Sequence, residues 1–249
     1  GFVYEGDIIV ANRSMSVVYI QKKVNDGGSG GFYAAMKEAF NRGYDWLWLM
    51  DDDGLPDRKE LKELYNKSVE YHLQYANALV LDIKDPTHFS FGLSKGRLVY
   101  TVEDAKKKPV IEDVANPFNG TFVSREVIEK IGFIKKEMFI WGDEIEYFLR
   151  TKKNRFKIAT VPSAVHLHPK SVNKNNYISF YNWKVPDVFG TRFICVHRNK
   201  GYIYSRYYGI CGIIKYLIAN TAIYVCNFQF KKWLLFIKYY FEGVFNYYK

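Results

Sequence analysis

Residues 44–56 read YDWLWLMDDDGLP, and this stretch decides the fold. Its first seven residues are almost wholly apolar, which is typical of a strand covered on both faces. Three aspartates and a Gly-Leu-Pro turn follow without a spacer. The stretch therefore predicts a buried strand in the middle of a sheet, with a cluster of charge at its carboxyl end.

The segments on either side of this strand alternate between apolar runs and amphipathic stretches. Before it we expect short buried strands at 6–10 and 16–20, a glycine-dense loop at 25–31 and a helix at 32–42. After it we expect a helix at 58–71, a strand at 76–83 and hairpin material at 87–102. These are followed by a turn leading into a strand at 117–123, a helix at 125–131, an acidic helix start at 143–150 and a strand at 157–161. This alternation of strands and helices predicts an α/β fold with a mostly parallel sheet flanked by helices.

Composition narrows the class of protein. The chain has 249 residues, a formal net charge of +10, 48 % hydrophobic residues and three cysteines with no C-x-x-C pair. That length and apolar content exclude a disordered chain. The cysteine usage excludes a disulfide scaffold and a Cys-rich zinc module, and it fits a reducing compartment.

The positive charge is concentrated after residue 199. Residues 200–249 hold seven of the basic residues, sixteen aromatic residues and a single acid, Glu242. We therefore divide the chain into an α/β domain at 1–199 and a helical basic-aromatic appendage at 200–249. Bases interleaved with aromatics suit nucleic acid or the headgroup layer of an anionic membrane. Residues 208–225 are the transmembrane candidate, but Lys215 and Asn220 interrupt them and favour a packed or interfacial helix.

The three aspartates point to a metal. Side chains alternate along an extended chain, so Asp51 and Asp53 converge while Asp52 points away. Two hard oxygen ligands at the carboxyl end of a sheet suit Mg²⁺ or Mn²⁺ bridging a diphosphate. The structural alternative is an acidic turn completed by the Gly-Leu-Pro segment at 54–56.

Residues 141–146, WGDEIE, form a second group of candidate functional residues. Acids in a first helical turn are stabilised by the helix dipole, which is the structural alternative. Glu146 and Arg150 are four residues apart and are expected to pair. Asp143 or Glu144 is then free to act as a general base, and Trp141 could stack on a sugar ring.

Two histidines and the glycine-dense loop complete the candidates. His166 and His168 face the same side of an extended segment, and one of them is a credible third ligand beside Asp51 and Asp53. The loop at 25–31 offers backbone N–H groups to a phosphate or to sugar hydroxyls. It matches neither a P-loop nor a dinucleotide-binding fingerprint.

These motifs follow one another in a specific order: Asn-x-Gly-Gly-x-Gly-Gly-Phe from 25, Asp-Asp-Asp-Gly-x-Pro from 51, Phe-Asn-Gly from 118, Trp-Gly-Asp-Glu-x-Glu from 141 and a histidine before Pro169. In this order the chain, over roughly residues 8–199, resembles the family 2 inverting glycosyltransferases with the Rossmann-like GT-A fold. It is most similar to their galactofuranosyl- and rhamnosyltransferase-like branch.

The resemblance implies roles for individual residues. Asp51, Asp53 and His168 would be the ligands of Mn²⁺ or Mg²⁺, and His168 matches the family position better than His166. Glu144 would be the base, with Asp143 as its rival, because the family more often has Asp there. Trp141 would be the acceptor platform. The donor-binding residues would be Asp52, Asn25, Gly27, Gly28, Gly30, Asn119 and Gly120.

The chain departs from the family pattern near its start. No T-x-N-R-like segment precedes residue 6, and Ala11 stands where the family usually has an Asp that reads the nucleotide base. The spacing from Ser14 to Val17 is also too short for the usual helix. These departures suggest that an N-terminal segment or an internal loop is absent from the sequence.

The resemblance implies transfer of a sugar, with inversion, from a nucleoside-diphosphate donor to a hydroxyl of a glycan or lipid-linked acceptor in cell-surface polysaccharide synthesis. UDP-galactofuranose is the favoured donor, followed by dTDP-rhamnose or a UDP-hexopyranose. We expect a cytoplasmic enzyme held by its basic-aromatic tail on the anionic inner face of the cell membrane, with no nucleic-acid partner. A homo-oligomer contact is the alternative use of that tail. The alternative functions are another metal-dependent enzyme, such as a nucleotidyltransferase or phosphohydrolase, and a non-catalytic basic binding module.

Overall fold

The central strand β3 (Trp46–Met50) shows how the sequence folds locally. In the computed structural model, which describes residues 2–10, 13–96, 98–170 and 177–248, its side chains alternate between the two faces of the sheet. Leu47 and Leu49 are buried in one hydrophobic core, whereas Trp46 and Trp48 pack against the other. Both faces are therefore covered, as the apolar run predicts.

The central sheet has the strand order β3–β9–β5–β10–β4, with β8 paired to β10. Its other members are β9 (Asn119–Ser124), β5 (Tyr75–Asp82), β10 (Ile158–His168), β4 (Leu55–Pro56) and β8 (Ile111–Glu112). The predicted α/β class is confirmed, but the sheet is mixed rather than mostly parallel. β5 and β10 pair in parallel, whereas β9 runs antiparallel to both β3 and β5. β3, β5 and β10 consequently end at the same edge.

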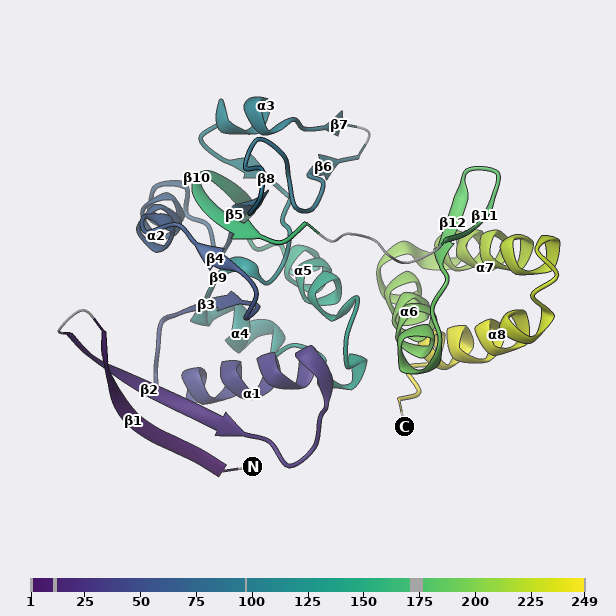
Figure 1. Cartoon of the computed structure of the whole chain (residues 1–249), viewed down its shortest axis with the longest axis horizontal. Coiled ribbons are helices and arrows are strands. Elements are labelled where there is room, and N and C mark those ends of the chain that lie inside the picture. The colour runs from purple at the N-terminus through teal and green to yellow at the C-terminus, as the bar shows by residue number, and fades with distance from the viewer. Residues whose placement is uncertain (1, 11–12, 97, 171–176, 249) are drawn as a thin grey trace.

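Helices cover both faces of this sheet (Figure 1). The core that contains Leu47 and Leu49 also takes side chains from α1 (Gly27–Asn41), α4 (Arg125–Ile131) and α5 (Asp143–Lys153). The core on the opposite face is closed by α2 (Glu60–Tyr71) through Leu64. This sandwich of helix, sheet and helix is the layered architecture that the alternating sequence pattern predicts.

The first two strands differ from their prediction. β1 (Phe2–Val10) and β2 (Arg13–Gln21) pair only with each other, as an antiparallel hairpin outside the central sheet. Val17 and Tyr19 are exposed, so the expected buried strand at 16–20 is wrong. Among the described residues, β2 pairs with β1 and with no strand of the central sheet, so one face of the hairpin remains exposed. Arg42, just after α1, forms an ion pair with Glu5 of β1. Ala11 lies outside the described residues.

The segment between β5 and β9 covers the carboxyl end of β5. It contains the hairpin of β6 (Ser94–Lys95) and β7 (Leu98–Val99), which lies inside the predicted hairpin region, and the short helix α3 (Val102–Lys106). Leu93, Val102 and Ile111 pack on Leu79 and Leu81 of β5 in a core of their own. This cover makes one wall beside the edge where the acidic residues lie.

The C-terminal region is a helical unit built on a small hairpin. The hairpin pairs β11 (Tyr177–Phe180) with β12 (Trp183–Pro186), and the helices are α6 (Gly190–Ile203), α7 (Gly209–Cys226) and α8 (Phe230–Val244). Their shared core contains Phe193, Tyr224 and Phe236. The appendage is helical, as expected, and Figure 1 shows α6 beside α7 and α8. The unit starts before residue 200, because α6 begins at Gly190.

The stretch Gly190–Cys226 is long and apolar enough to cross a membrane by length and composition alone. It is not one regular helix, because a π-helical turn, η2 (Tyr204–Tyr208), separates α6 from α7. Gly209 follows with φ +66°, a left-handed conformation that glycine adopts without steric cost. Within α7, Asn220 is buried and donates a hydrogen bond to the carbonyl oxygen of Tyr216.

Candidate active site

A pocket of about 760 Å³ opens where β3 and β10 end and where α1 and α5 begin. Nine of the residues singled out by the sequence line it: Gly28, Asp51, Asp52, Asp53, Asn119, Trp141, Asp143, Glu144 and His168. Residues from five separated segments of the chain thus converge on one hollow. The carboxyl edge of a sheet is the usual place for a ligand site in α/β folds.

Strand pairing explains why the acids meet the histidine. The aspartates follow β3 directly, and the chain then forms β4, which pairs antiparallel with β10 through Leu55 and Leu167. That register brings Asp53 beside His168, whose Nε2 lies 3.1 Å from Asp53 Oδ1. Asp51, Asp53 and His168 each offer one ligand atom, and these atoms lie within 4.8 Å of one another. Two carboxylate oxygens and one imidazole nitrogen form a suitable donor set for a divalent metal ion.

The surroundings of His168 fix its orientation. Its Nδ1 lies 2.7 Å from the carbonyl oxygen of Pro169, and its ring packs on Phe91 with the centroids 4.9 Å apart. A carbonyl oxygen only accepts, so Nδ1 is the donor in this contact, and the ring is held with Nε2 facing Asp53. This is how outer partners commonly orient a metal-binding histidine.

Asp51 has a raised pKa. Although part of the side chain remains in contact with solvent, desolvation in the pocket is the largest cause, and the negative charge of Asp53 acts in the same direction. Asp143 and Asp52 add smaller contributions of the same sign. The folded protein therefore holds these carboxylates together at an electrostatic cost that a bound cation would offset.

His166 belongs to a different arrangement. It is fully buried, and its Nδ1 lies 3.1 Å from a carboxylate oxygen of Glu60, which is also fully buried. Gly120 (φ +68°) faces this pair, and a Cβ atom there would lie 2.2 Å from a Glu60 oxygen. Gly54, in the acidic turn, packs in the same way against Nε2 of His166. The buried pair thus supports the turn from below and does not line the pocket.

Asp143 and Glu144 occupy the first turn of α5, at the edge of the pocket. Asp143 is 5 % exposed, and one Glu144 oxygen accepts a hydrogen bond of 3.1 Å from the N–H of Gly142. Desolvation, followed by the hydrogen bond and the charge shared with Asp143, raises the pKa of Glu144 to about 8. A raised pKa makes the Glu144 carboxylate a stronger base than an ordinary carboxylate, and the group acts as a base once it has lost its proton.

Trp141 lies between the pocket and the helical unit. Its ring lines the pocket, and the guanidinium of Arg192 from α6 sits 5.5 Å from the ring centroid. Its backbone is in the left-handed region, with φ +60°. Trp141 thus belongs both to the lining of the pocket and to the contact with the helical unit.

The glycine-dense segment is not the expected loop. α1 begins at Gly27, so the glycines form its first turns, and the predicted helix start at residue 32 is wrong. Tertiary contact overrides the low helix propensity of glycine here. A Cβ atom on Gly27 would lie 2.1 Å from the carbonyl oxygen of Phe139, which accepts a hydrogen bond from the N–H of Ser29.

Four predicted donor-binding residues are not among the residues that line the pocket. Asn25 accepts a hydrogen bond from the N–H of Gly27, and Gly30 packs against the carboxylate of Asp26. Together with Gly27 and Gly120, they shape the backbone around the site. Gly28 alone from this segment reaches the pocket, at the amino terminus of α1, where helix N–H groups favour an anion.

The pocket also contains residues that the sequence did not reveal. Phe91, Asn116 and Lys170 line it. Phe91 and Asn116 come from the irregular cover between β5 and β9, where no periodic pattern or motif spacing marks them. The composition around Lys170 gives no signal either, since basic residues occur throughout the chain.

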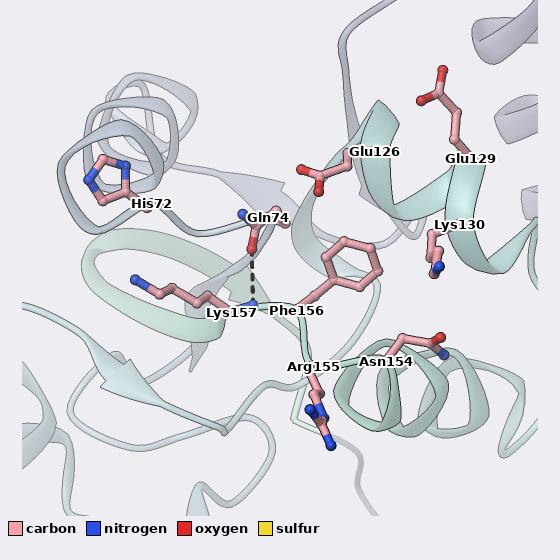
Figure 2. A pocket seen from close by; sticks show the side chains of 9 residues that line it. All are labelled: His72, Gln74, Glu126, Glu129, Lys130, Asn154, Arg155, Phe156 and Lys157. Carbon is pink, nitrogen blue, oxygen red and sulfur yellow. Dashed lines mark hydrogen bonds between the residues drawn. The ribbon is translucent and has the colours of Figure 1, made fainter.

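A second hollow of about 670 Å³ lies at the opposite end of the sheet, near the start of β5 and β10. Its lining includes His72, Glu129, Lys130, Arg155 and Lys157. Figure 2 shows the charged ends of Glu129 and Arg155 pointing away from each other, and the drawn hydrogen bond joins Gln74 to the backbone N–H of Lys157. These groups do not converge, so the acidic pocket is the better candidate for catalysis.

Comparison with known proteins gives consistent matches. The model of the family described as glycosyl transferase family 2 matches residues 9–132. Galactofuranosyltransferase GlfT1 of Mycobacterium tuberculosis (strain ATCC 25618 / H37Rv) is 31 % identical over 205 residues, covering 80 % of this chain and 67 % of that protein. GlfT1 of Mycolicibacterium smegmatis is 27 % identical over 208 residues, covering 80 % of this chain and 68 % of that protein.

Two solved structures align with this chain at low sequence identity. GalNAc-T7, crystallised with UDP, GalNAc and Mn²⁺, aligns with a TM-score of 0.46 and 14 % identity over 75 % of this chain. S. aureus TarS aligns with a TM-score of 0.42 and 10 % identity over 88 % of this chain. This chain spans 39 % and 43 % of those two solved chains.

Proposed function

Because the chain belongs to glycosyl transferase family 2, we propose that it transfers galactofuranose from UDP-galactofuranose to a hydroxyl of a glycan or lipid-linked acceptor, in cell-surface polysaccharide synthesis. The names of the similar GlfT1 proteins support the choice of sugar. dTDP-rhamnose and UDP-hexopyranoses are the competing donors. The observation that carries the proposal is the convergence of Asp51, Asp53, His168 and Glu144 on one pocket.

The donor would bind at the end of β3. Asp51, Asp53 and His168 would hold Mn²⁺ or Mg²⁺, and the tight arrangement of their ligand atoms supports this role. The bound ion would stabilise the negative charge that develops on the departing nucleoside diphosphate. Gly28 at the amino terminus of α1 would offer its backbone N–H to the same diphosphate. Asp52 and Asn119 line the wall where the donor sugar or ribose would lie.

The acceptor would bind on the other side of the pocket, against Trp141. Glu144 would take the proton from the acceptor hydroxyl while that oxygen attacks the anomeric carbon, with inversion. The bond from the acceptor oxygen to the anomeric carbon forms as the bond to the diphosphate oxygen breaks. Asp143, one residue away and also in the pocket, is the rival base.

Release of nucleoside diphosphate from a donor panel tests this function. Purified protein is assayed with UDP-galactofuranose, dTDP-rhamnose and UDP-hexopyranoses, with Mn²⁺, with Mg²⁺ and with a chelator, and with and without a glycan acceptor. We expect UDP release that requires both the metal and the acceptor. Release of pyrophosphate or inorganic phosphate instead would indicate a nucleotidyltransferase or phosphohydrolase. No release with any donor would contradict the proposal.

We further propose that the helical unit holds the enzyme on the anionic cytoplasmic face of the membrane. α7 exposes Ile210, Ile214 and Ile218 along one side, and α8 exposes Phe230 and Leu234. Exposed lysines flank them, Lys215 on α7 and Lys231 and Lys238 on α8. Apolar side chains beside lysines are typical of helices that lie in the headgroup layer. Co-sedimentation with anionic vesicles measures this binding; a contact between copies of the chain is the alternative, which sizing by light scattering detects.

A further inference from the structure

The segment Met138–Gly142 connects the short helix η1 (Lys136–Met138) to α5, and its backbone is strained. Phe139 and Trp141 are non-glycine residues with φ values of +66° and +60°, and Gly142 has φ +105°. Residues other than glycine rarely adopt this left-handed backbone conformation. It is maintained only where contacts with the rest of the protein stabilise it. The segment therefore needs an external support.

Asn199 of α6 provides that support. It is 1 % exposed, and its Nδ2 lies 2.9 Å, 3.0 Å and 2.9 Å from the carbonyl oxygens of Met138, Ile140 and Trp141. A side-chain amide has two N–H hydrogens, so three carbonyls share them. Its Oδ1 accepts a hydrogen bond from the Tyr248 hydroxyl at 3.3 Å. One buried amide thus gathers three carbonyl oxygens that would otherwise repel one another.

The supported segment leads directly into the catalytic side of the pocket. It carries Trp141, and it ends at Gly142, the residue before Asp143 and Glu144. The other half of the pocket has a different support, because β3, β4 and β10 hold the aspartates and His168. A change at Asn199 is therefore expected to disturb the base and the acceptor platform but to leave the metal ligands in place.

A second contact joins the same two parts of the molecule. The Tyr207 hydroxyl, from the π-helical turn η2, donates a hydrogen bond of 2.6 Å to Oε1 of Glu146 in α5. Glu146 is 1 % exposed and also accepts from Arg150 at 3.0 Å. The helical unit consequently holds α5 both before its first turn and within it.

We propose that Asn199 is a positioning residue that holds Trp141 and the first turn of α5 in place, so that the helical unit completes the active site. The part of this proposal that concerns catalysis rests on the proposed transferase function. The part that concerns the backbone of residues 138–146 is independent of that function.

Hydrogen exchange measured by mass spectrometry tests the backbone part. Asn199→Ala removes the amide, and Asn199→Asp keeps its shape but removes both donors. Asn220→Ala is the matched control, because Asn220 is another buried asparagine of the helical unit and bonds only within α7. In both Asn199 variants we expect exchange about tenfold faster in peptides covering 138–146 and at Ser29, whose N–H bonds to Phe139.

Unchanged exchange at 138–146 in both Asn199 variants would overturn the proposal. So would an equal increase in the Asn220→Ala control, or an increase spread over the whole helical unit, because either result means general destabilisation. These readouts need no enzymatic activity, so the proposal is judged even if the wild type transfers no sugar and the proposed function fails on its own assay.

Kinetics test the catalytic part. In Asn199→Asp we expect kcat to fall by roughly 10- to 100-fold, because small misplacements of a base and an acceptor are costly. The affinity for UDP with Mn²⁺, measured by calorimetry, should stay within about twofold of wild type, since β3, β4 and β10 hold Asp51, Asp53 and His168 independently of Asn199. An unchanged kcat beside faster exchange would overturn the positioning role, as would loss of UDP binding in proportion to kcat.

Discussion

The pocket and the helical unit carry side-chain charges of opposite sign. The pocket gathers Asp51, Asp52, Asp53, Asp143 and Glu144 around one hollow, with Lys170 as the basic residue of its lining. Residues 200–249 instead contain seven bases and one acid among sixteen aromatic residues. Residues 200–249 therefore contribute +6 of the formal net charge of +10, although they make up only a fifth of the chain. The acids suit a cation and its diphosphate, and the bases with aromatics suit an anionic surface.

The largest effect we expect comes from removing one charge from the pocket. Asp53→Asn should lower UDP release by about 10³-fold or more, because it removes a ligand from the cation that stabilises the leaving group. Asp45→Asn is the control: Asp45 is also exposed, but it lies just before β3, at the end of the strand away from the pocket.

Thermal unfolding separates loss of metal from loss of catalysis in the same variant. Mn²⁺ should raise the Tm of the wild type and of Asp45→Asn, because the ion binds the folded protein. It should leave the Tm of Asp53→Asn almost unchanged. An equal Mn²⁺ shift in all three proteins would show that the acidic turn is not the metal site.

The second effect concerns the base. Glu144→Gln should lower kcat by about 10²-fold, because the glutamine cannot take the acceptor proton. In the wild type, activity should rise with pH as Glu144 loses its proton, with a midpoint near its raised pKa of about 8. Glu144→Gln should lose this rise. Asp143→Asn is the matched variant, and full activity of Glu144→Gln with an inactive Asp143→Asn would assign the base to Asp143.

Sequence reasoning succeeded where chemistry and periodicity coincide. The apolar run at 44–50 predicted the buried strand, and the three acids at its end predicted a ligand site at the carboxyl edge of the sheet. The sequence-based prediction was wrong where a contact between residues far apart in the sequence determines the conformation. Gly27 and Gly28 suggested a loop, but packing of Gly27 on Phe139 allows a helix to start there.

Asn199 shows the same limit more sharply. Its three hydrogen-bond acceptors lie 58 to 61 residues earlier in the chain. No local pattern marks such a residue, and the sequence instead suggested a domain boundary directly after it. The excess of bases and aromatics after residue 199 is thus clear in composition, whereas the start of α6 at Gly190 and the contacts that join the helical unit to the pocket appear only in three dimensions.

A third, smaller effect probes the helical unit alone. His197 is fully buried, with Nε2 2.8 Å from the Tyr224 hydroxyl, and burial lowers its pKa from the ordinary 6.5 to about 3. The folded state keeps this ring neutral, whereas the unfolded chain takes up a proton below pH 6.5. Stability is therefore complete above pH 6.5 and is lost as the pH falls toward 3.

Urea unfolding between pH 6.5 and 5 measures this loss. The wild type should lose about 2 kcal/mol more of its unfolding free energy over this interval than His197→Gln, which cannot titrate. His72→Asn, at an exposed histidine that ends α2, should retain the wild-type pH dependence. Identical pH dependence in the wild type and His197→Gln would mean that the ring is not held neutral in the fold.

The smallest effect tests the outer surface of the helical unit. Each lysine near an anionic membrane contributes about 1 kcal/mol, so Lys238→Gln should weaken binding to phosphatidylglycerol vesicles by about fivefold. Lys37→Gln removes the same charge from an exposed position of α1 and should leave binding unchanged, although both variants have the same net charge. Equal weakening in both would mean that net charge alone attracts the protein. Weaker binding of Lys238→Gln than of Lys37→Gln would show that the basic region of the helical unit is the part that faces the lipid.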